Sequence, residues 1–196
     1  LEEVGIGFMF APAFHPAMKY AGAPRREIGI RTVFNILGPL TNPAGAKAQV
    51  LGVADGTLLE KMTSVLKSLG SQHALVVHGD DGLDEITLTS KTQVCELNNG
   101  SIRSYAIAPE DFGFSRTSPD SLKGGTAAEN AMLLRSVLAG EHGPRRDVVL
   151  MNTAAALMAG DRVASLQKGI DLAREALDNG RALSKLEQFI AVSQRV

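Results

Sequence analysis

The stretch QVLGVADGTLLEKMTSVLKSLGSQHALVV, residues 49–77, decides the fold. It opens with an apolar run at 49–53 and closes with a second apolar run at 74–77. Each run is short, rich in valine and leucine, and bounded by polar or small residues, which is typical of a buried strand. We therefore expect two strands separated by about twenty residues, a distance that leaves room for a helix.

The segment between these two runs carries the signature of a helix. Thr57 and Glu60 have the spacing of a capping box, in which the hydroxyl and the carboxylate satisfy backbone N–H groups at the start of a helix. Apolar residues recur at helical intervals over 58–69, and Gly70 ends the pattern. A strand–helix–strand unit predicts parallel strands joined by a right-handed crossover.

The remaining elements extend this α/β unit on both sides. Before it, we expect a short strand at 7–10 and a helix over 15–28. After it, we expect short strands with hairpin turns between them, one turn at Asn98-Asn99-Gly100. A second capping box at 126–129 opens a helical tail. The expected strands are 85–88, 92–97 and 102–107, and the expected helices are 126–139, 145–159, 164–178 and 182–193.

The composition indicates one globular domain, or a large part of one, without a strong charge bias. The chain has 196 residues, of which 44% are hydrophobic, and its formal net charge is −1. A general nucleic-acid binder usually shows a basic excess, so we expect no nucleic-acid partner. No run of about 20 apolar residues is present, so we expect no membrane span. The single cysteine, Cys95, requires no oxidising compartment, and we expect a cytoplasmic protein.

An acidic turn follows the second strand of the opening stretch. The sequence HGDDGLDE, residues 78–85, carries four carboxylates in eight residues. Ligands of open α/β sheets lie beyond the carboxyl ends of the strands, where this turn is expected. The adjacent acids Asp84 and Glu85 offer hard oxygen ligands of the kind that hold Mg²⁺ together with substrate phosphates. A merely solvated acidic turn is the alternative that the turn alone leaves open.

Two further stretches are candidates for a substrate site. Residues 31–43 contain two prolines and Gly38, where the backbone can approach a substrate closely. Residues 11–26 contain His15 and Arg25, and an arginine can bind a carboxylate at two points. On their own, the residues favour a structural corner in the first stretch and a solvated arginine with a helix-capping histidine in the second.

Taken together, the motifs resemble anthranilate phosphoribosyltransferase along essentially the whole chain and in the family's order. The stretch from Phe8 to Pro43 is long and highly specific, whereas the acidic turn is specific only in combination with the others. The motifs are Phe8-Met9-Phe10-Ala11-Pro12, His15-Pro16-Ala17-Met18-Lys19, Arg25 to Asn35, Gly38-Pro39-Leu40-Thr41-Asn42-Pro43, Gly82-Leu83-Asp84-Glu85, Ala127-Ala128-Glu129-Asn130-Ala131 and Asn152-Thr153-Ala154-Ala155-Ala156-Leu157.

The resemblance implies a reaction and a set of site residues. Enzymes of that family transfer the phosphoribosyl group of phosphoribosyl pyrophosphate to anthranilate in tryptophan biosynthesis and release pyrophosphate. By resemblance, Asp84 and Glu85 hold Mg²⁺ on the pyrophosphate, and Arg25 contacts the anthranilate carboxylate. Pro12, His15 and Gly38 line the anthranilate channel. No acid–base pair is assigned, and His15 as a proton acceptor is a secondary hypothesis.

The resemblance also implies a domain arrangement that this sequence matches only in part. Family members combine a small helical domain with a larger α/β domain and usually form homodimers through the helical part. The family's glycine-rich phosphate loop, which lies upstream in its members, has no counterpart in these 196 residues. We therefore expect residues 1–196 to be the C-terminal part of a single α/β catalytic domain, with a mixed sheet flanked by helices. On its own, this fragment is expected to be inactive and to self-associate.

Three alternative interpretations of the sequence can be distinguished by experiment. A pyrimidine nucleoside phosphorylase shares the broad architecture, and phosphorolysis of thymidine or uridine would reveal it. A non-catalytic, nucleic-acid-binding relative would bind DNA in a salt-sensitive way without turnover. A third reading is a structural fragment that has no activity of its own.

Overall fold

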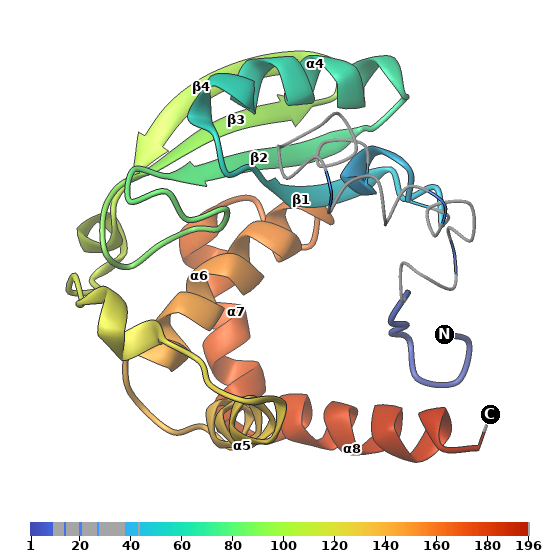
Figure 1. Cartoon of the computed structure of the whole chain (residues 1–196), viewed down its shortest axis with the longest axis vertical. Helices are drawn as coiled ribbons and strands as arrows, with labels where there is room; N and C mark the ends of the chain where they lie inside the picture. The colour runs from blue at the N-terminus through green and yellow to red at the C-terminus, as the bar shows by residue number, and fades with distance from the viewer. Residues whose placement is uncertain (10–13, 15–19, 21–26, 28–37, 43, 196) are drawn as a thin grey trace. The chain divides into compact units, whose positions relative to one another are not determined.

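The computed structural model describes residues 1–9, 14, 20, 27, 38–42 and 44–195. The chain divides into two compact units, one formed by residues 1–46 and 187–196 and the other by residues 47–186. The larger unit contains the sheet and the helices that pack on it (Figure 1). No helix in the described part of the chain is both long and apolar enough to cross a membrane.

The larger unit is built on a mixed four-stranded sheet with the strand order β1-β2-β3-β4. Strands β1 (Ala48–Gly52) and β2 (His73–Gly79) pair in parallel, as the opening stretch predicts. Strands β3 (Thr92–Asn98) and β4 (Ser101–Ile107) continue the sheet in antiparallel pairing. The expected α/β class with a mixed sheet flanked by helices is therefore confirmed.

The turn between β3 and β4 has the backbone that its sequence predicts. Asn98 pairs with Ser101, so the loop is the two-residue stretch Asn99-Gly100. Both loop residues have positive φ angles, 47° at Asn99 and 84° at Gly100. A two-residue hairpin with positive φ at both positions matches the twist of the flanking strands, and Asn-Gly is the preferred sequence for it.

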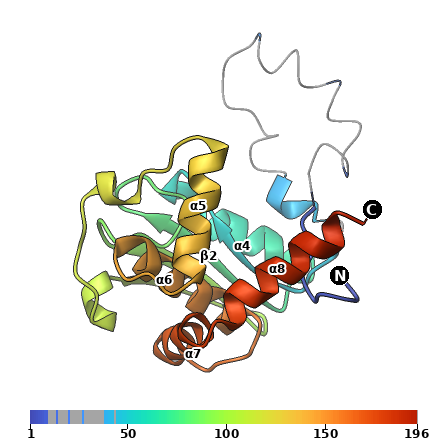
Figure 2. The ribbon, with the colours of Figure 1, turned by 90° about the horizontal axis from the view of Figure 1, so that it is seen from below.

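Helices cover both faces of the sheet (Figure 1). Helix α4 (Leu59–Ser68) lies on one face, where the Thr63 hydroxyl contacts the carbonyl oxygen of Cys95 at 3.3 Å. Helices α6 (Pro144–Ala159) and α7 (Leu166–Asp178) share the main core with the opposite face and pack against each other (Figure 2). A β-carbon at Gly169 would lie 2.8 Å from the Cα of Ala154, so the glycine permits close packing of α6 and α7.

The helix starts confirm one predicted cap and correct the other. Thr126 and Glu129 form the predicted capping box at the start of α5 (Ala127–Leu138). The expected box at Thr57 is wrong, because Asp55 caps a 3₁₀ turn there by accepting the Thr57 N–H at 2.9 Å. The remaining elements are η2 (Gly38–Leu40), η3 (Gly56–Leu58), η4 (Pro109–Phe112), η5 (Pro119–Leu122) and α8 (Arg181–Ser193).

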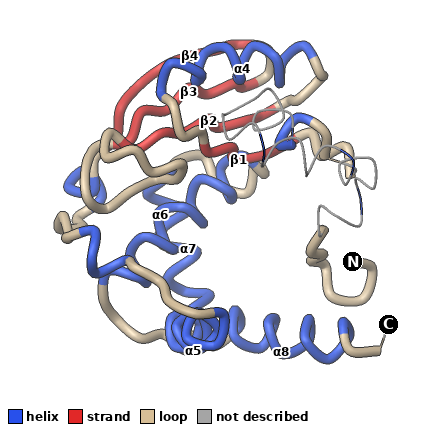
Figure 3. The backbone as a smooth tube through the Cα atoms, viewed as in Figure 1, coloured by secondary structure: helices blue, strands red, loops and turns tan. Residues whose placement is uncertain are grey.

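Two expected strands differ from the structure. Residues 7–9 form no strand, and the helix expected at 15–28 lies largely outside the described residues. Residues 85–88 are irregular in backbone and lie in the loop between β2 and β3 (Figure 3). Ile86 and Leu88 are nevertheless fully buried. The apolar residues at 86 and 88 give this segment the sequence pattern of a strand. Its backbone groups, however, form hydrogen bonds with side chains and not with a neighbouring strand.

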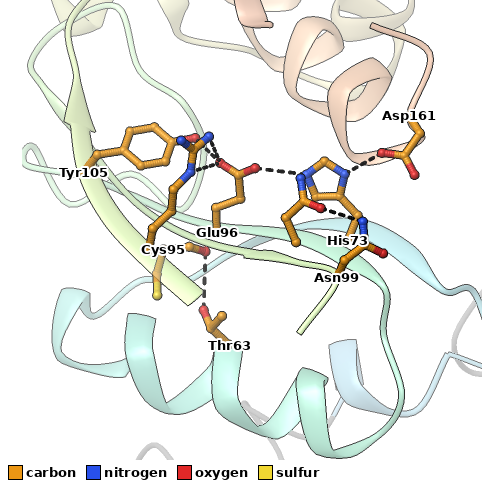
Figure 4. A network of polar contacts seen from close by, with 9 residues as sticks. Thr63, His73, Cys95, Glu96, Asn99, Tyr105 and Asp161 are labelled. Atoms are coloured by element: carbon orange, nitrogen blue, oxygen red, sulfur yellow. Dashed lines mark hydrogen bonds and ion pairs between the residues drawn. The ribbon is translucent and has the colours of Figure 1, made fainter. Parts of the chain in front are cut away.

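A hydrogen-bond network around a buried carboxylate connects the sheet to the end of α6 (Figure 4). Glu96 is 1% exposed and accepts hydrogen bonds from Tyr105, Arg103 and His73. The other ring nitrogen of His73 contacts Asp161, just after α6, at 2.8 Å. Burial alone would raise the pKa of Glu96, but the three donors outweigh burial and lower it. The phenol of Tyr105 has a raised pKa because it is buried and donates to this anion.

Candidate metal and substrate site

The acidic turn lies at the edge of the sheet where α/β proteins bind ligands. Its first two residues, His78 and Gly79, end β2, and its acids begin directly after the strand, whose carboxyl end lies beside that of the parallel strand β1. Gly79 donates its N–H to the carbonyl oxygen of Leu83 at 2.8 Å, and Gly82 donates to Gly79 at 2.8 Å. Gly82 has a φ angle of +89°, a conformation that favours glycine. The two glycines thus close a tight turn that displays its acidic side chains.

Two of the four acids in this turn accept hydrogen bonds from nearby residues. Asp81 accepts the N–H of Leu83 at 3.2 Å and the hydroxyl of Thr87 at 2.7 Å, and it also accepts the hydroxyl of Thr89. Burial by itself raises the pKa of the Asp81 carboxyl, but the two hydroxyls and the backbone donor outweigh it and lower the pKa. Asp80 accepts a hydrogen bond from the side chain of Gln93 at 2.9 Å.

Asp84 and Glu85 have a different environment from these two acids. Both side chains are exposed, and neither makes a hydrogen bond or ion pair with another described residue. The described residues contain no group of three or more His, Cys, Asp or Glu side chains that could hold a metal ion by themselves. A pair of free carboxylates fits Mg²⁺, which is commonly held by one or two carboxylates while water and substrate phosphates complete its shell.

The backbone around this carboxylate pair is fixed on both sides. A β-carbon at Gly52, the last residue of β1, would overlap the carbonyl oxygen of Asp84. No other residue type fits at Gly52 while the Asp84 backbone stays in place. After the pair, Ile86 is bound at its N–H and its carbonyl by the side chain of Asn152. The sequence motif contains Asn152, but no local pattern assigns it this contact.

The residues expected to bind anthranilate fall mostly outside the described part of the chain. Pro12, His15 and Arg25 are not among the described residues. Gly38 begins η2, and its carbonyl accepts the hydroxyl of Thr41 at 3.1 Å. The roles expected for these four residues therefore stay predictions.

Comparison with known proteins shows the family to which the chain belongs. The chain belongs to the family described as "Glycosyl transferase family, a/b domain", whose profile matches residues 1–183. Within that class, the chain is similar to curated proteins named anthranilate phosphoribosyltransferase. The protein from Chloroflexus aurantiacus is 57% identical over 196 residues, covering 99% of this chain and 58% of that protein. The protein from Acetivibrio thermocellus is 53% identical over 190 residues, covering 97% of this chain and 55% of that protein.

Solved structures give the same result and confirm the resemblance found in the motifs. The anthranilate phosphoribosyltransferase of Thermus thermophilus superimposes with a TM-score of 0.89 at 45% identity, covering 97% of this chain and 56% of that one. The Saccharomyces cerevisiae enzyme in complex with PRPP and Mg gives a TM-score of 0.85 at 30% identity, covering 93% and 53%. This chain therefore spans a little over half the length of the relatives it matches.

Proposed function

We propose that the chain forms the α/β part of an anthranilate phosphoribosyltransferase that transfers the phosphoribosyl group of PRPP to anthranilate in tryptophan biosynthesis. The main observation that supports this proposal is the exposed pair Asp84 and Glu85. The pair lies on a tight turn at the carboxyl ends of two parallel strands. The names of the relatives and the PRPP–Mg complex of the yeast enzyme support the same assignment.

In this proposal the acid pair serves the leaving group. The carboxylates of Asp84 and Glu85 would hold a Mg²⁺ ion, and the bound ion would offset the charge that develops on departing pyrophosphate. The ribose carbon gains oxocarbenium character as its bond to pyrophosphate breaks, by analogy with glycosyl transfer. Arg25 binds the anthranilate carboxylate and orients the amine, while Pro12, His15 and Gly38 line the channel. Orientation rather than a strong general base accounts for the reactivity of the amine.

The proposal extends to the setting in which the chain works. Because residues 1–196 span a little over half of the relatives, we propose that they do not turn over substrate without the remaining length. They represent part of one α/β catalytic domain in this view, and the complete enzyme is a cytoplasmic homodimer.

The deciding experiment uses the full-length protein that carries this sequence. Turnover is followed by the loss of anthranilate fluorescence in the presence of PRPP and Mg²⁺. Asp84→Asn and Glu85→Gln are expected to lower kcat/KM by roughly a hundredfold, because each removes charge that stabilises the transition state. Asp80→Asn is the matched control: it removes the same charge from the same turn, keeps the acceptor for Gln93, and is expected to stay within about twofold.

The outcomes separate the proposal from its rivals. If Asp84→Asn and Glu85→Gln behave like Asp80→Asn, the acid pair does not serve the reaction. Phosphorolysis of thymidine or uridine without anthranilate turnover would assign the protein to the nucleoside phosphorylases instead. Arg25→Ala in the same assay is expected to raise KM for anthranilate and leave KM for PRPP unchanged, since its charge faces the anthranilate carboxylate.

A further inference from the structure

Asn152 binds both backbone polar groups of the residue that follows the acid pair. Its Oδ1 accepts the N–H of Ile86 at 3.0 Å, and its Nδ2 donates to the carbonyl oxygen of Ile86 at 2.8 Å. The same Nδ2 donates to the carbonyl oxygen of Val148 at 3.0 Å, one turn earlier in α6. The amide is thus fixed to its own helix while it holds a segment 66 positions away in the chain.

This contact replaces a missing strand neighbour. Residues 85–88 belong to no strand, so Ile86 has no ladder partner for its N–H or its carbonyl. Ile86 is nevertheless fully buried, and buried backbone groups without partners are costly. A side-chain amide presents one acceptor and one donor side by side, as a neighbouring strand does. Asn152 therefore stabilises an irregular backbone at a buried position.

Gly52 constrains the same segment from the other side of the acid pair. The carbonyl oxygen of Asp84 occupies the space that a β-carbon at Gly52 would need. Asp84 and Glu85 consequently project from a backbone that is packed against β1 at one end and bound to α6 at the other. Their side chains are exposed, while the backbone before and after them is held by these contacts.

We propose that Asn152 is a positioning residue for the carboxylates of Asp84 and Glu85. It acts through the backbone of Ile86, without contact to the metal, and sets the direction in which the two carboxylates leave the turn. This inference rests on the proposed function, because it assigns Asn152 to the metal site described there. Residues that orient metal ligands without touching the metal typically change metal affinity by about 10–100-fold when replaced.

The test measures metal affinity directly in the full-length protein. Mn²⁺ serves as the probe, and the unbound ion is counted by electron paramagnetic resonance. Asn152→Ala and Asn152→Ser are expected to weaken Mn²⁺ binding about tenfold. Asn152→Ser keeps a small polar side chain in case the alanine variant does not fold. Thr63→Val is the control for general destabilisation, because it removes a buried hydroxyl from α4 and leaves the acidic turn untouched.

Hydrogen exchange at the Ile86 amide gives a second readout. Asn152→Ala is expected to accelerate exchange at Ile86 more than at neighbouring core amides, and Thr63→Val is not. Wild-type Mn²⁺ affinity in both Asn152 variants, alongside lost affinity in Asp84→Asn and Glu85→Gln, would overturn the inference and leave the proposed function intact. Unchanged affinity in Asp84→Asn and Glu85→Gln would overturn both.

Discussion

Replacing Glu96 by glutamine is expected to destabilise the protein by about 3–4 kcal/mol at pH 7. The carboxylate is 1% exposed, with one oxygen 3.1 Å from His73 Nε2 and the other 2.8 Å from the Tyr105 hydroxyl. A glutamine presents one oxygen and one amide NH₂ group, so only one of the two contacts keeps an acceptor, and the contact to His73 persists only in the tautomer whose Nε2 accepts a hydrogen bond. A lost hydrogen bond to a buried charged group costs about 1.5–3 kcal/mol, and the loss of charge weakens the other contacts.

Arg103 adds little to this figure. Its side chain is 68% exposed, although it approaches Glu96 at 2.8 Å and 3.1 Å through two nitrogens. Solvent screens an exposed partner, so its contribution is about 0–1 kcal/mol. Urea unfolding of wild type and Glu96→Gln measures the difference. Glu110→Gln is the matched control, because Glu110 forms an exposed ion pair with Arg116 and its loss is expected to cost less than about 1 kcal/mol.

The pH dependence tests the origin of the effect. The folded protein holds the pKa of Glu96 below its usual value of 4.5, so the carboxylate stabilises the fold above that pH. As the pH falls through the lowered pKa, the wild-type carboxylate becomes protonated and this stabilisation disappears. The difference between wild type and Glu96→Gln should therefore be full at neutral pH and shrink in acid. A difference below about 1 kcal/mol at pH 7, or one that is constant down to acid pH, would refute the reasoning.

Two further substitutions probe other buried contacts. Gly52→Ala inserts a methyl group against the Asp84 carbonyl, so we expect a loss of about 1–3 kcal/mol in urea unfolding and weaker Mn²⁺ binding; wild-type values for both would contradict this packing. Arg146→Met removes a guanidinium that is 3% exposed and bonds the Gly140 carbonyl at 2.9 Å and Asp178. We expect it to lower the thermal midpoint and cost about 2–4 kcal/mol, and a change within about 0.5 kcal/mol would show that these bonds add no net stability.

The sequence predicts the parts of this fold that depend on neighbouring residues. The parallel pair β1 and β2, its crossover helix and the Asn99-Gly100 turn all follow from local periodicity and turn chemistry. The error at Thr57 is also local, because Asp55 offers a competing oxygen two residues earlier. Periodicity alone cannot decide which of two nearby side chains caps a helix.

The sequence predicts the candidate site only in part, because contacts with other residues determine which of the four acids keep free carboxylates. The sequence alone does not distinguish the four acids of the turn. In the structure, Asp81 accepts hydrogen bonds from Thr87 and Thr89, and Asp80 accepts one from Gln93 in β3. The adjacency of Asp84 and Glu85, together with the family motif, predicts these two acids as metal ligands, and their exposed side chains are compatible with that role.

The irregular backbone at 85–88 is compatible with a metal site. In a regular strand, adjacent side chains point to opposite faces, so Asp84 and Glu85 could not both serve one ligand. An irregular backbone removes this restriction, but it leaves the polar groups of Ile86 without a ladder. Asn152 supplies the missing partners at 3.0 Å and 2.8 Å, which lets a buried segment stay irregular beside two exposed acids. The burial of Ile86 accounts for this contact from a helix 66 positions away, and the Mn²⁺ measurements on the Asn152 variants decide whether it also serves the acid pair.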